Sequence, residues 1–193
     1  MGTVKICAYD PEWPHAFDAV ARGLRSLIGD AATRIDHIGS TSVPGLDAKD
    51  VIDVQVSVAD AENLERVSRE LARGGWIAPA EVFRDHPVPG VSAGPSDWQK
   101  RFFSQPDGMR RVNVHVRIEG RHNQRYALLF RDYLRVSPSS ASAYAMLKRH
   151  LALLLPDESE RYADVKDPAC DLIYFAAEQW ATQTGWYVGL SDG

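Results

Sequence analysis

The chain has 193 residues, of which 45% are hydrophobic and 25% charged, so disordered, collagen-like and low-complexity classes are excluded. Its net charge of −4 argues against a general nucleic-acid binder, and no apolar run approaches the roughly 18 residues that span a membrane. The N-terminus lacks the apolar stretch of a signal peptide. We therefore expect one cytoplasmic domain over residues 1–193, with neither nucleic acid nor a membrane as partner.

The first half of the chain is predicted to alternate helices and strands. Apolar residues recur at helical spacing from Phe17 to Ile28, after a capping sequence at 10–12, which predicts a helix. A short strand is expected at 33–38, and alternating β-branched and polar residues at 51–58 predict a second strand. Helical spacing over 61–71 ends at Gly74 and Gly75, and another short strand is expected at 76–77.

The segment 79–108 has a different character. Five prolines and three glycines break every periodicity there, which predicts a long loop that binds a ligand or moves. Part of it, at about 98–103, is expected to form a strand. Trp98 and Phe103 are candidates either to stack on a ligand ring or to anchor this loop to the core.

The second half begins with a strand and continues as helices. Residues 111–118 alternate apolar side chains with Asn113, His115 and Arg117, which places these three polar residues on one face of a strand. After Gly120, apolar stripes predict three helices, the last over about 169–184, so 120–185 is mostly helical. The order of elements indicates an α+β (α/β-like) fold with a helical C-terminal half.

One group of residues is a candidate site for binding phosphate and a metal ion. Gly39 and Ser40 follow the first strand, Asp53 lies inside the second, and His115 lies in a later strand. Glycine lets the backbone approach a phosphate, serine adds a hydroxyl donor, and a carboxylate can hold Mg²⁺ or Mn²⁺ that bridges phosphate oxygens. Alternation along the strand places Gln55 on the same face as Asp53. The alternative interpretation is a simple turn followed by a structural carboxylate.

Several motifs together resemble the GrpB family, in that family's order and over roughly residues 4–170. They are the stretch 37–49 (HIGSTSVPGLDAK), the segment 51–53, the opening 9–13 (YDPEW), the segment 113–116 (NVHV), the block 130–135 (FRDYLR), and Tyr144 with Lys148. The resemblance implies a nucleotidyltransferase-type fold, a mixed β-sheet flanked by helices. It also implies a link to dephospho-coenzyme A kinase, to which some family members are fused.

The resemblance also implies roles for particular residues. The superfamily pattern consists of Gly-Ser, two spaced acids and a third acid on a later strand; Gln55 and His115 stand where acids are expected. Asp53 and His115 are the expected catalytic residues, and Asp53, His115 and Gln55 the expected ligands of Mg²⁺ or Mn²⁺. Contacts with phosphate or substrate are expected from a larger set: Gly39, Ser40, Thr41, Ser42, Lys49, Asn113, Arg117, Arg131 and Arg135.

Two functions are compatible with these residues. The first is a metal-dependent nucleotidyltransferase that acts on a nucleotide and an unknown small-molecule or protein acceptor. The missing acids favour the alternative, a non-catalytic module that binds a nucleotide, a coenzyme A-related ligand or a protein partner. Arg131 and Arg135 could likewise clamp a phosphate or only form ion pairs on a helix surface. In both cases the expected ligand is a nucleotide or another phosphate-containing small molecule.

Overall fold

The computed structural model describes residues 3–79 and 83–193; Met1, Gly2 and part of the predicted loop, 80–82, lie outside the described residues. Its helices are α1 (Trp13–Ile28), α2 (Ala61–Arg73), α3 (His122–Val136), α4 (Pro138–Leu154) and α5 (Ser159–Thr184). Its strands are β1 (Arg34–Ile38), β2 (Ile52–Val58), β3 (Lys100–Ser104) and β4 (Val112–Ile118). Two short 3₁₀ turns, η2 (Ser40–Ser42) and η3 (Pro95–Trp98), precede β2 and β3.

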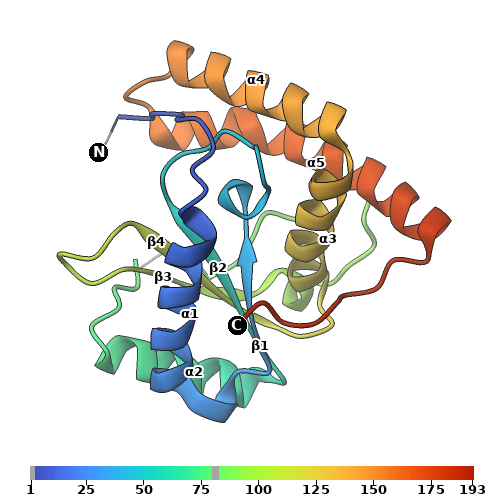
Figure 1. The fold of residues 1–193 in the computed structure, drawn as a ribbon. Helices are drawn as coiled ribbons and strands as arrows, with labels where there is room; N and C mark the ends of the chain where they lie inside the picture. The colour runs from blue at the N-terminus through green and yellow to red at the C-terminus, as the bar shows by residue number, and fades with distance from the viewer. Residues whose placement is uncertain (1–2, 80–82) are drawn as a thin grey trace.

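The strands of the described chain form one mixed sheet in the order β1-β2-β4-β3 (Figure 1). The central pair, β2 and β4, is parallel, whereas β1 and β3 run antiparallel to their neighbours. Helices flank this sheet, and α3, α4 and α5 make up the C-terminal half of the chain. The arrangement confirms the predicted α+β class with a mixed sheet and a helical C-terminal half.

One face of the sheet is apolar and builds the main core. Because side chains alternate along a strand, Val54 and Val56 of β2 and Val114 of β4 point to the same side. There they are fully buried in one cluster with apolar residues of α1 and α2, such as Trp13 and Leu64. This packing fixes the position of β2 and β4, and therefore of every side chain on the opposite face.

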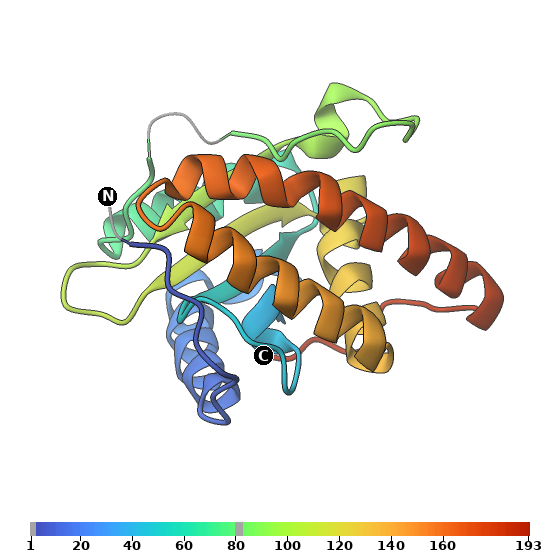
Figure 2. The same cartoon turned by 90° about the horizontal axis from the view of Figure 1, so that it is seen from above.

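The opposite face is polar and is covered by the helical half. Gln55 and Ser57 of β2 both bond to Gln124 at the start of α3: Gln55 Nε2 donates to its backbone oxygen, and Ser57 Oγ accepts from its amide. Helices α4 and α5 run side by side (Figures 1 and 2). A polar sheet face under amphipathic helices leaves room for a cavity lined by charged groups.

Three boundaries differ from the sequence predictions. Helix α5 begins at Ser159, ten residues before the predicted start, because the chain stays helical through Pro168, a residue type that usually ends a helix. The strand expected at 76–77 is only an isolated bridge between Ile77 and Ser104. The segment 79–108 contains η3 and β3, so the strand expected at about 98–103 is present with bounds shifted by one or two residues.

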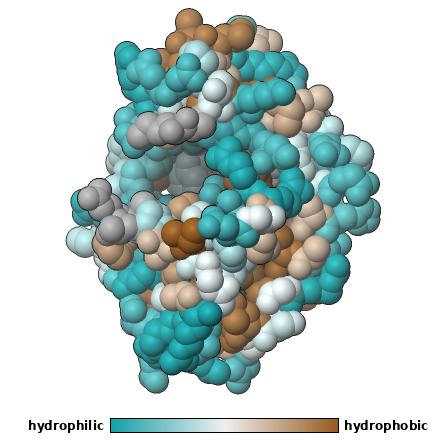
Figure 3. Space-filling model, turned by 90° about the vertical axis from the view of Figure 1, so that its left-hand side faces the viewer, coloured by the Kyte–Doolittle hydropathy of each residue, from teal (hydrophilic) through white to brown (hydrophobic). Residues whose placement is uncertain are grey.

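The surface is largely polar. Figure 3 shows a mainly hydrophilic face, with apolar colouring at its top, where α4 and α5 lie in Figure 1, and again in its lower half. Exposed Leu153 and Leu154 at the end of α4 belong to the apolar surface of the molecule. Across residues 3–79 and 83–193, no helix combines the length and the apolar character needed to cross a membrane.

Candidate functional site

The turn at Gly39 lies directly against the carboxylate of Asp53. Gly39 follows β1 with a φ of 70° and a ψ of −170°, a backbone conformation that is essentially restricted to glycine. A Cβ atom at this position would lie 2.4 Å from Asp53 Oδ2 and 3.0 Å from its Cβ and Cγ atoms. The chain therefore requires glycine here both for the turn and for the close approach to the acid.

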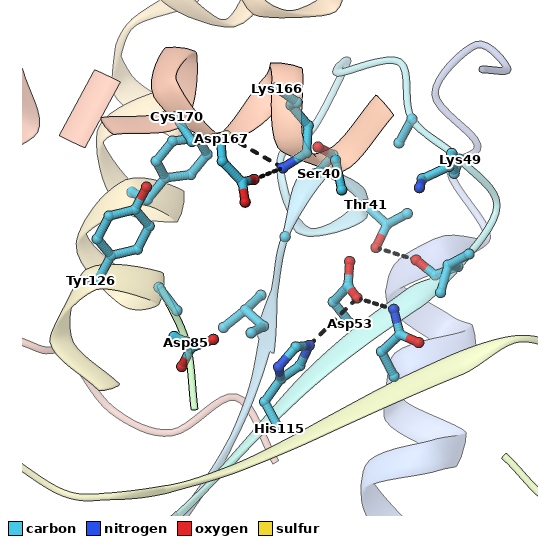
Figure 4. A pocket seen from close by; sticks show the side chains of 18 of the residues that line it. Ser40, Thr41, Lys49, Asp53, Asp85, His115, Tyr126, Lys166, Asp167 and Cys170 are labelled. Carbon is cyan, nitrogen blue, oxygen red and sulfur yellow. Dashed lines mark hydrogen bonds and ion pairs between the residues drawn. The ribbon is translucent and has the colours of Figure 1, made fainter. Parts of the chain in front are cut away.

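Hydrogen-bond donors hold Asp53 in its ionised form. Its Oδ1 accepts from Asn113 Nδ2 at 2.8 Å and lies 3.9 Å from His115 Nε2; Figure 4 shows Asp53 and His115 pointing toward one another. Burial raises the pKa of Asp53, but His115, Asn113 and the charge of Lys49 outweigh burial and bring the pKa below its usual value. Its Oδ2 makes no hydrogen bond with any described residue and is available to a ligand.

His115 is a neutral imidazole that carries its proton on Nε2. Burial, with the charges of Lys100 and Arg117, lowers its pKa to about 4. Its Nδ1 lies 3.4 Å from Nη2 of Arg117, a group that can only donate, so Nδ1 accepts and the proton resides on Nε2. His115 therefore presents a neutral N–H toward Asp53 rather than a basic nitrogen.

Lys148 connects the helical half of the protein to the Gly-Ser turn. It lies on α4, is 3% exposed, and donates to Ser40 Oγ at 2.7 Å and to the backbone oxygen of Asp47. Its Nζ also lies 4.6 Å from the centre of the Tyr144 ring. Burial and the charge of Lys166 lower the pKa of Lys148 to about 7. This amine consequently changes its charge near physiological pH.

These groups line a cavity of about 500 Å³ between the polar sheet face and the C-terminal helices. Its described lining holds three Asp but six basic side chains, so it is positive although the whole chain carries −4. The basic residues are Lys49, Lys100, Arg111, Arg117, Lys148 and Lys166. Lys100 and Arg117 pair with Asp85, and Lys166 with Asp167, whereas no described carboxylate lies within 4.0 Å of Lys49, Arg111 or Lys148. Such a lining favours an anionic ligand.

The segment before β3 contributes a carboxylate to the same cavity. Asp85 Oδ1 accepts from Lys100 Nζ at 2.6 Å, and Oδ2 accepts from Arg117 Nε at 2.9 Å and Asn123 Nδ2 at 3.0 Å. Burial raises the pKa of Asp85, but Arg117 and Lys100 outweigh burial, so its pKa lies well below the usual range. The backbone of Asp85 also donates to the carbonyl oxygen of Trp98 at 2.8 Å, which ties this segment to η3.

The structure brings most of the predicted site residues together. Eight of them line the cavity: Gly39, Ser40, Thr41, Lys49, Asp53, Asn113, His115 and Arg117. Two of the eight are committed to other contacts. Thr41 is 1% exposed and its hydroxyl donates to the carbonyl oxygen of Val51, and Arg117 is bound to Asp85. The remaining groups can face a ligand.

Three predicted phosphate-binding residues lie outside the cavity lining. The hydroxyl of Ser42 donates to the carbonyl oxygen of Gly39 at 2.6 Å, and Arg135 Nε donates to the carbonyl oxygen of Ser42 at 3.0 Å. Arg131 is 4% exposed and pairs with Asp132 and Asp192 at 2.7 and 2.6 Å. These contacts hold η2 and α3 in place, so we assign no ligand contact to the three residues.

Of the three predicted metal ligands, only Asp53 has an atom that can hold a cation. Gln55 is fully buried outside the cavity lining, and its Oε1 accepts from the Arg117 guanidinium at 2.7 Å, so a cation there would meet a positive charge. His115 carries its proton on the nitrogen that faces Asp53. Within the described residues, no three His, Cys, Asp or Glu side chains gather as a metal site. Asp53 Oδ2 remains, and Mg²⁺ often binds one or two carboxylates together with the phosphates of a ligand.

Several cavity residues were not predicted from the sequence. Lys148 has a weak signal, because it stands one helical turn after Tyr144 in a motif of the resemblance, but this motif does not indicate a role for it. Asp85 lies in a Pro-rich segment without periodicity, and Asn123 lies in the first turn of α3. Only the folded chain places these two residues beside Arg117 and the cavity.

The fold and the cavity define an α+β protein with a cationic cavity between a mixed sheet and a helical half. A family model described as GrpB protein matches residues 3–175. The chain belongs to this family, which confirms the resemblance inferred from the motifs.

Similar proteins differ in length. The dephospho-CoA kinase of Mycolicibacterium paratuberculosis is 32% identical over 195 residues, which cover 95% of this chain but 48% of that protein. The UPF0157 protein BH1888 of Halalkalibacterium halodurans is 34% identical over 165 residues, covering 85% of this chain and 77% of that protein. The crystal structure of the conserved protein GrpB from Enterococcus faecalis has a TM-score of 0.74 and 30% identity, covering 91% of this chain and 99% of that one. The chain thus spans about half the length of the mycobacterial relatives it matches.

Proposed function

We propose that the protein binds a nucleotide in this cavity through its phosphates. The observation that carries the proposal is the group Lys49, Arg111 and Lys148, which line one cavity with Ser40 and have no carboxylate partner among the described residues. A phosphate chain would supply the negative charge that these cations lack, and Lys and Arg donors bind phosphate oxygens by charge-assisted hydrogen bonds.

The rest of the cavity suits the nucleoside part of such a ligand. Its volume of about 500 Å³ lies in the usual range for small-molecule sites. Its lining includes aromatic side chains, among them Trp98, Tyr126 and Phe130, on which a planar base can pack. Trp98 therefore remains a candidate for stacking, whereas Phe103 is buried in the main core with the apolar sheet face.

A divalent cation would enter this site with the ligand. Asp53 Oδ2 is the protein oxygen that would hold it, and the cation would neutralise phosphate charge that the lysines do not reach. The chain's own residues position the ligand: Lys148 and Ser40 fix the Gly-Ser turn, and neutral His115 offers an N–H beside Asp53.

Nucleotidyl transfer is the second candidate function. It is favoured by the contact between Gly39 and Asp53, which juxtaposes a phosphate-approach turn and a carboxylate as the superfamily pattern requires. Gln55 and His115 in place of the further acids favour binding without turnover. Transfer from a nucleoside triphosphate to an acceptor would release pyrophosphate, so the two functions differ in a measurable product.

A ligand panel tests the proposal. The purified protein is heated with each of the four nucleoside triphosphates, coenzyme A or dephospho-coenzyme A, with Mg²⁺, Mn²⁺ or EDTA. The coenzyme A ligands are included because the mycobacterial relatives are named dephospho-CoA kinases. A ligand at 100 times its dissociation constant adds about 2.7 kcal/mol and raises the melting temperature clearly. If none of these ligands raises the melting temperature, the proposal is wrong; pyrophosphate release with cell extract as acceptor source would support transfer.

The variant Asp53→Asn tests the role of the acid. Because the amide keeps the shape of the side chain but loses the charge that would hold a cation, we expect ligand affinity in Mg²⁺ to fall by at least about tenfold, to the value measured in EDTA. Titration calorimetry with and without Mg²⁺ measures this difference.

The matched control for this variant is Asp167→Asn. Asp167 also lines the cavity, but its carboxylate pairs with Lys166 at 3.0 Å. We expect this control to keep the metal dependence of the wild type. Metal-dependent affinity that survives unchanged in Asp53→Asn would remove Asp53 from the site.

Lys148 gives the proposed site a pH dependence. With a pKa of about 7 it is partly neutral in the ligand-free protein, and a bound phosphate would favour its charged form. Binding should therefore take up a proton above pH 7, and affinity should fall by up to about tenfold per pH unit between about pH 7 and pH 9. Calorimetry in buffers of different ionisation enthalpy measures this uptake.

The variant Lys148→Arg separates this effect from other titrations. A guanidinium stays protonated throughout this range, so both the proton uptake and the loss of affinity above pH 7 should disappear. Equal affinity of the wild type at pH 6.5 and pH 8.5, in the absence of proton uptake, would contradict the assignment of Lys148 as a phosphate contact.

A further inference from the structure

One buried polar atom of the cavity has no partner in the described chain. Asn123 is 2% exposed and lines the cavity, and its side-chain oxygen Oδ1 is buried without a hydrogen bond. An unsatisfied acceptor of this kind destabilises the folded chain, and buried groups without a partner are uncommon in folded proteins. In a binding site, a donor group on the bound ligand can form the hydrogen bond that such an acceptor lacks.

The orientation of this amide is fixed by its surroundings. The Nδ2 atom carries two hydrogens, and it has two acceptors: Asp85 Oδ2 at 3.0 Å and the carbonyl oxygen of Gln99 at 3.0 Å. Rotating the amide by half a turn would place Oδ1 against both of these oxygens, one of them ionised. The atom left without a partner is therefore the acceptor, and it requires a donor.

Asn123 lies away from the phosphate-binding groups. It touches Asp85, which touches Arg117, and Arg117 in turn contacts His115 beside Asp53. Figure 4 shows Tyr126 and Asp85 on one side of the pocket and Lys49 on the opposite side. A nucleotide whose phosphates lie beside Lys49 would extend its nucleoside part toward the end formed by Trp98, Tyr126 and Asn123.

We propose that Asn123 Oδ1 accepts a hydrogen bond from an N–H or O–H group on the nucleoside part of the ligand. The donor is either an N–H of the base or a hydroxyl of the sugar. This inference rests on the proposed nucleotide binding and deepens it, because it assigns Asn123 as the residue that distinguishes ligands with this donor from ligands without it. A site built to accept a hydrogen bond rejects an analogue that lacks the donor.

The test removes one donor at a time from the ligand. The nucleotide that binds best in the panel is compared with analogues that lack one base or sugar donor each. For ATP these are purine riboside triphosphate, 2′-deoxyATP and 3′-deoxyATP. On the wild-type protein, one analogue should bind about 10- to 100-fold more weakly than the parent, because it leaves Asn123 Oδ1 unpaired. This arm needs no variant to fold.

Variants then assign the loss to Asn123. In Asn123→Leu the parent nucleotide and the weak analogue should bind equally, which couples the missing donor to this residue. The matched control is Gln124→Leu: Gln124 is the next residue, is also buried, and loses comparable amide contacts to Ser57 and Gly120 without lining the cavity. It should keep the discrimination of the wild type.

The outcomes separate this inference from the proposed function. If no nucleotide binds the wild type, both are overturned. If nucleotides bind but all analogues bind as well as the parent, or the discrimination persists in Asn123→Leu, nucleotide binding stands and the role of Asn123 is overturned.

Discussion

Replacing Gly39 with alanine is expected to weaken the proposed nucleotide binding about 100-fold and to destabilise the protein. The added Cβ would lie 2.4 Å from Asp53 Oδ2, so the carboxylate must move away from the Gly-Ser turn. A shift of about 1 Å in a binding group can cost about 100-fold in function, and we expect a loss of affinity of that size. Because φ is 70° and ψ is −170°, backbone strain alone should lower the free energy of unfolding by about 1–3 kcal/mol. Calorimetry and urea unfolding measure the two effects.

Gly45→Ala provides the matched control for Gly39→Ala. Gly45 also has a positive φ, of 78°, but a Cβ atom there would meet no atom within 4 Å. This control should lose stability through backbone strain, by about 1–2 kcal/mol, and keep the affinity of the wild type. If Gly39→Ala binds the ligand as well as Gly45→Ala does, the contact with Asp53 has no role in binding.

The placement of Gly39, Asp53 and His115 in one cavity follows from local features of the sequence. Strand alternation decides which side chains share a face, and the patterns at 51–58 and 111–118 are regular enough to be read without the structure. The register then pairs Asp53 with Asn113 and Gln55 with His115. The predicted polar face, and the glycine turn that precedes it, therefore follow from periodicity and from the motifs.

The roles of Arg131 and Gln55 depend on contacts that no local pattern contains. Arg131 pairs with Asp192, a residue 61 positions later in the chain, and Gln55 accepts from Arg117 on the neighbouring strand. Both side chains have the right type for a phosphate or metal site, but tertiary partners already occupy them. Residue type therefore indicated candidates, and burial and partners decided which of them can reach a ligand.

Asp85 is the clearest residue that the sequence could not place. The resemblance implies a further carboxylate on a strand, whereas the cavity receives one from the Pro-rich segment. That carboxylate is already neutralised by Lys100 and Arg117, so it differs in chemistry from a metal ligand. No periodicity leads from 79–108 to this contact, because a loop position is set by the elements on which it packs.

Replacing Asp85 with alanine should therefore cause a large loss of stability. The side chains of Lys100 and Arg117 are only 9% and 7% exposed, and the variant would leave both cations buried without their carboxylate. Removing one partner of a buried ion pair typically costs about 3–5 kcal/mol, and we expect a loss of this size in urea unfolding at pH 7. The matched control is Asp107→Ala, an exposed acid in the same segment, which should change stability by less than about 0.5 kcal/mol.

Acid pH supplies an independent test of the same contact. The pKa of Asp85 in the folded protein lies well below its value in the unfolded chain, about 3.9. Above that pH the ionised carboxylate therefore makes its full contribution to the free energy of unfolding. The contribution of Asp85 to the free energy of unfolding is lost as the pH falls below about 4. At that pH its carboxylate binds a proton in the unfolded chain but stays ionised in the folded protein. The difference in unfolding free energy between wild type and Asp85→Ala should consequently narrow from pH 5 to pH 2. A difference that stays constant over this range would show that the loss arises from packing rather than from the buried charges.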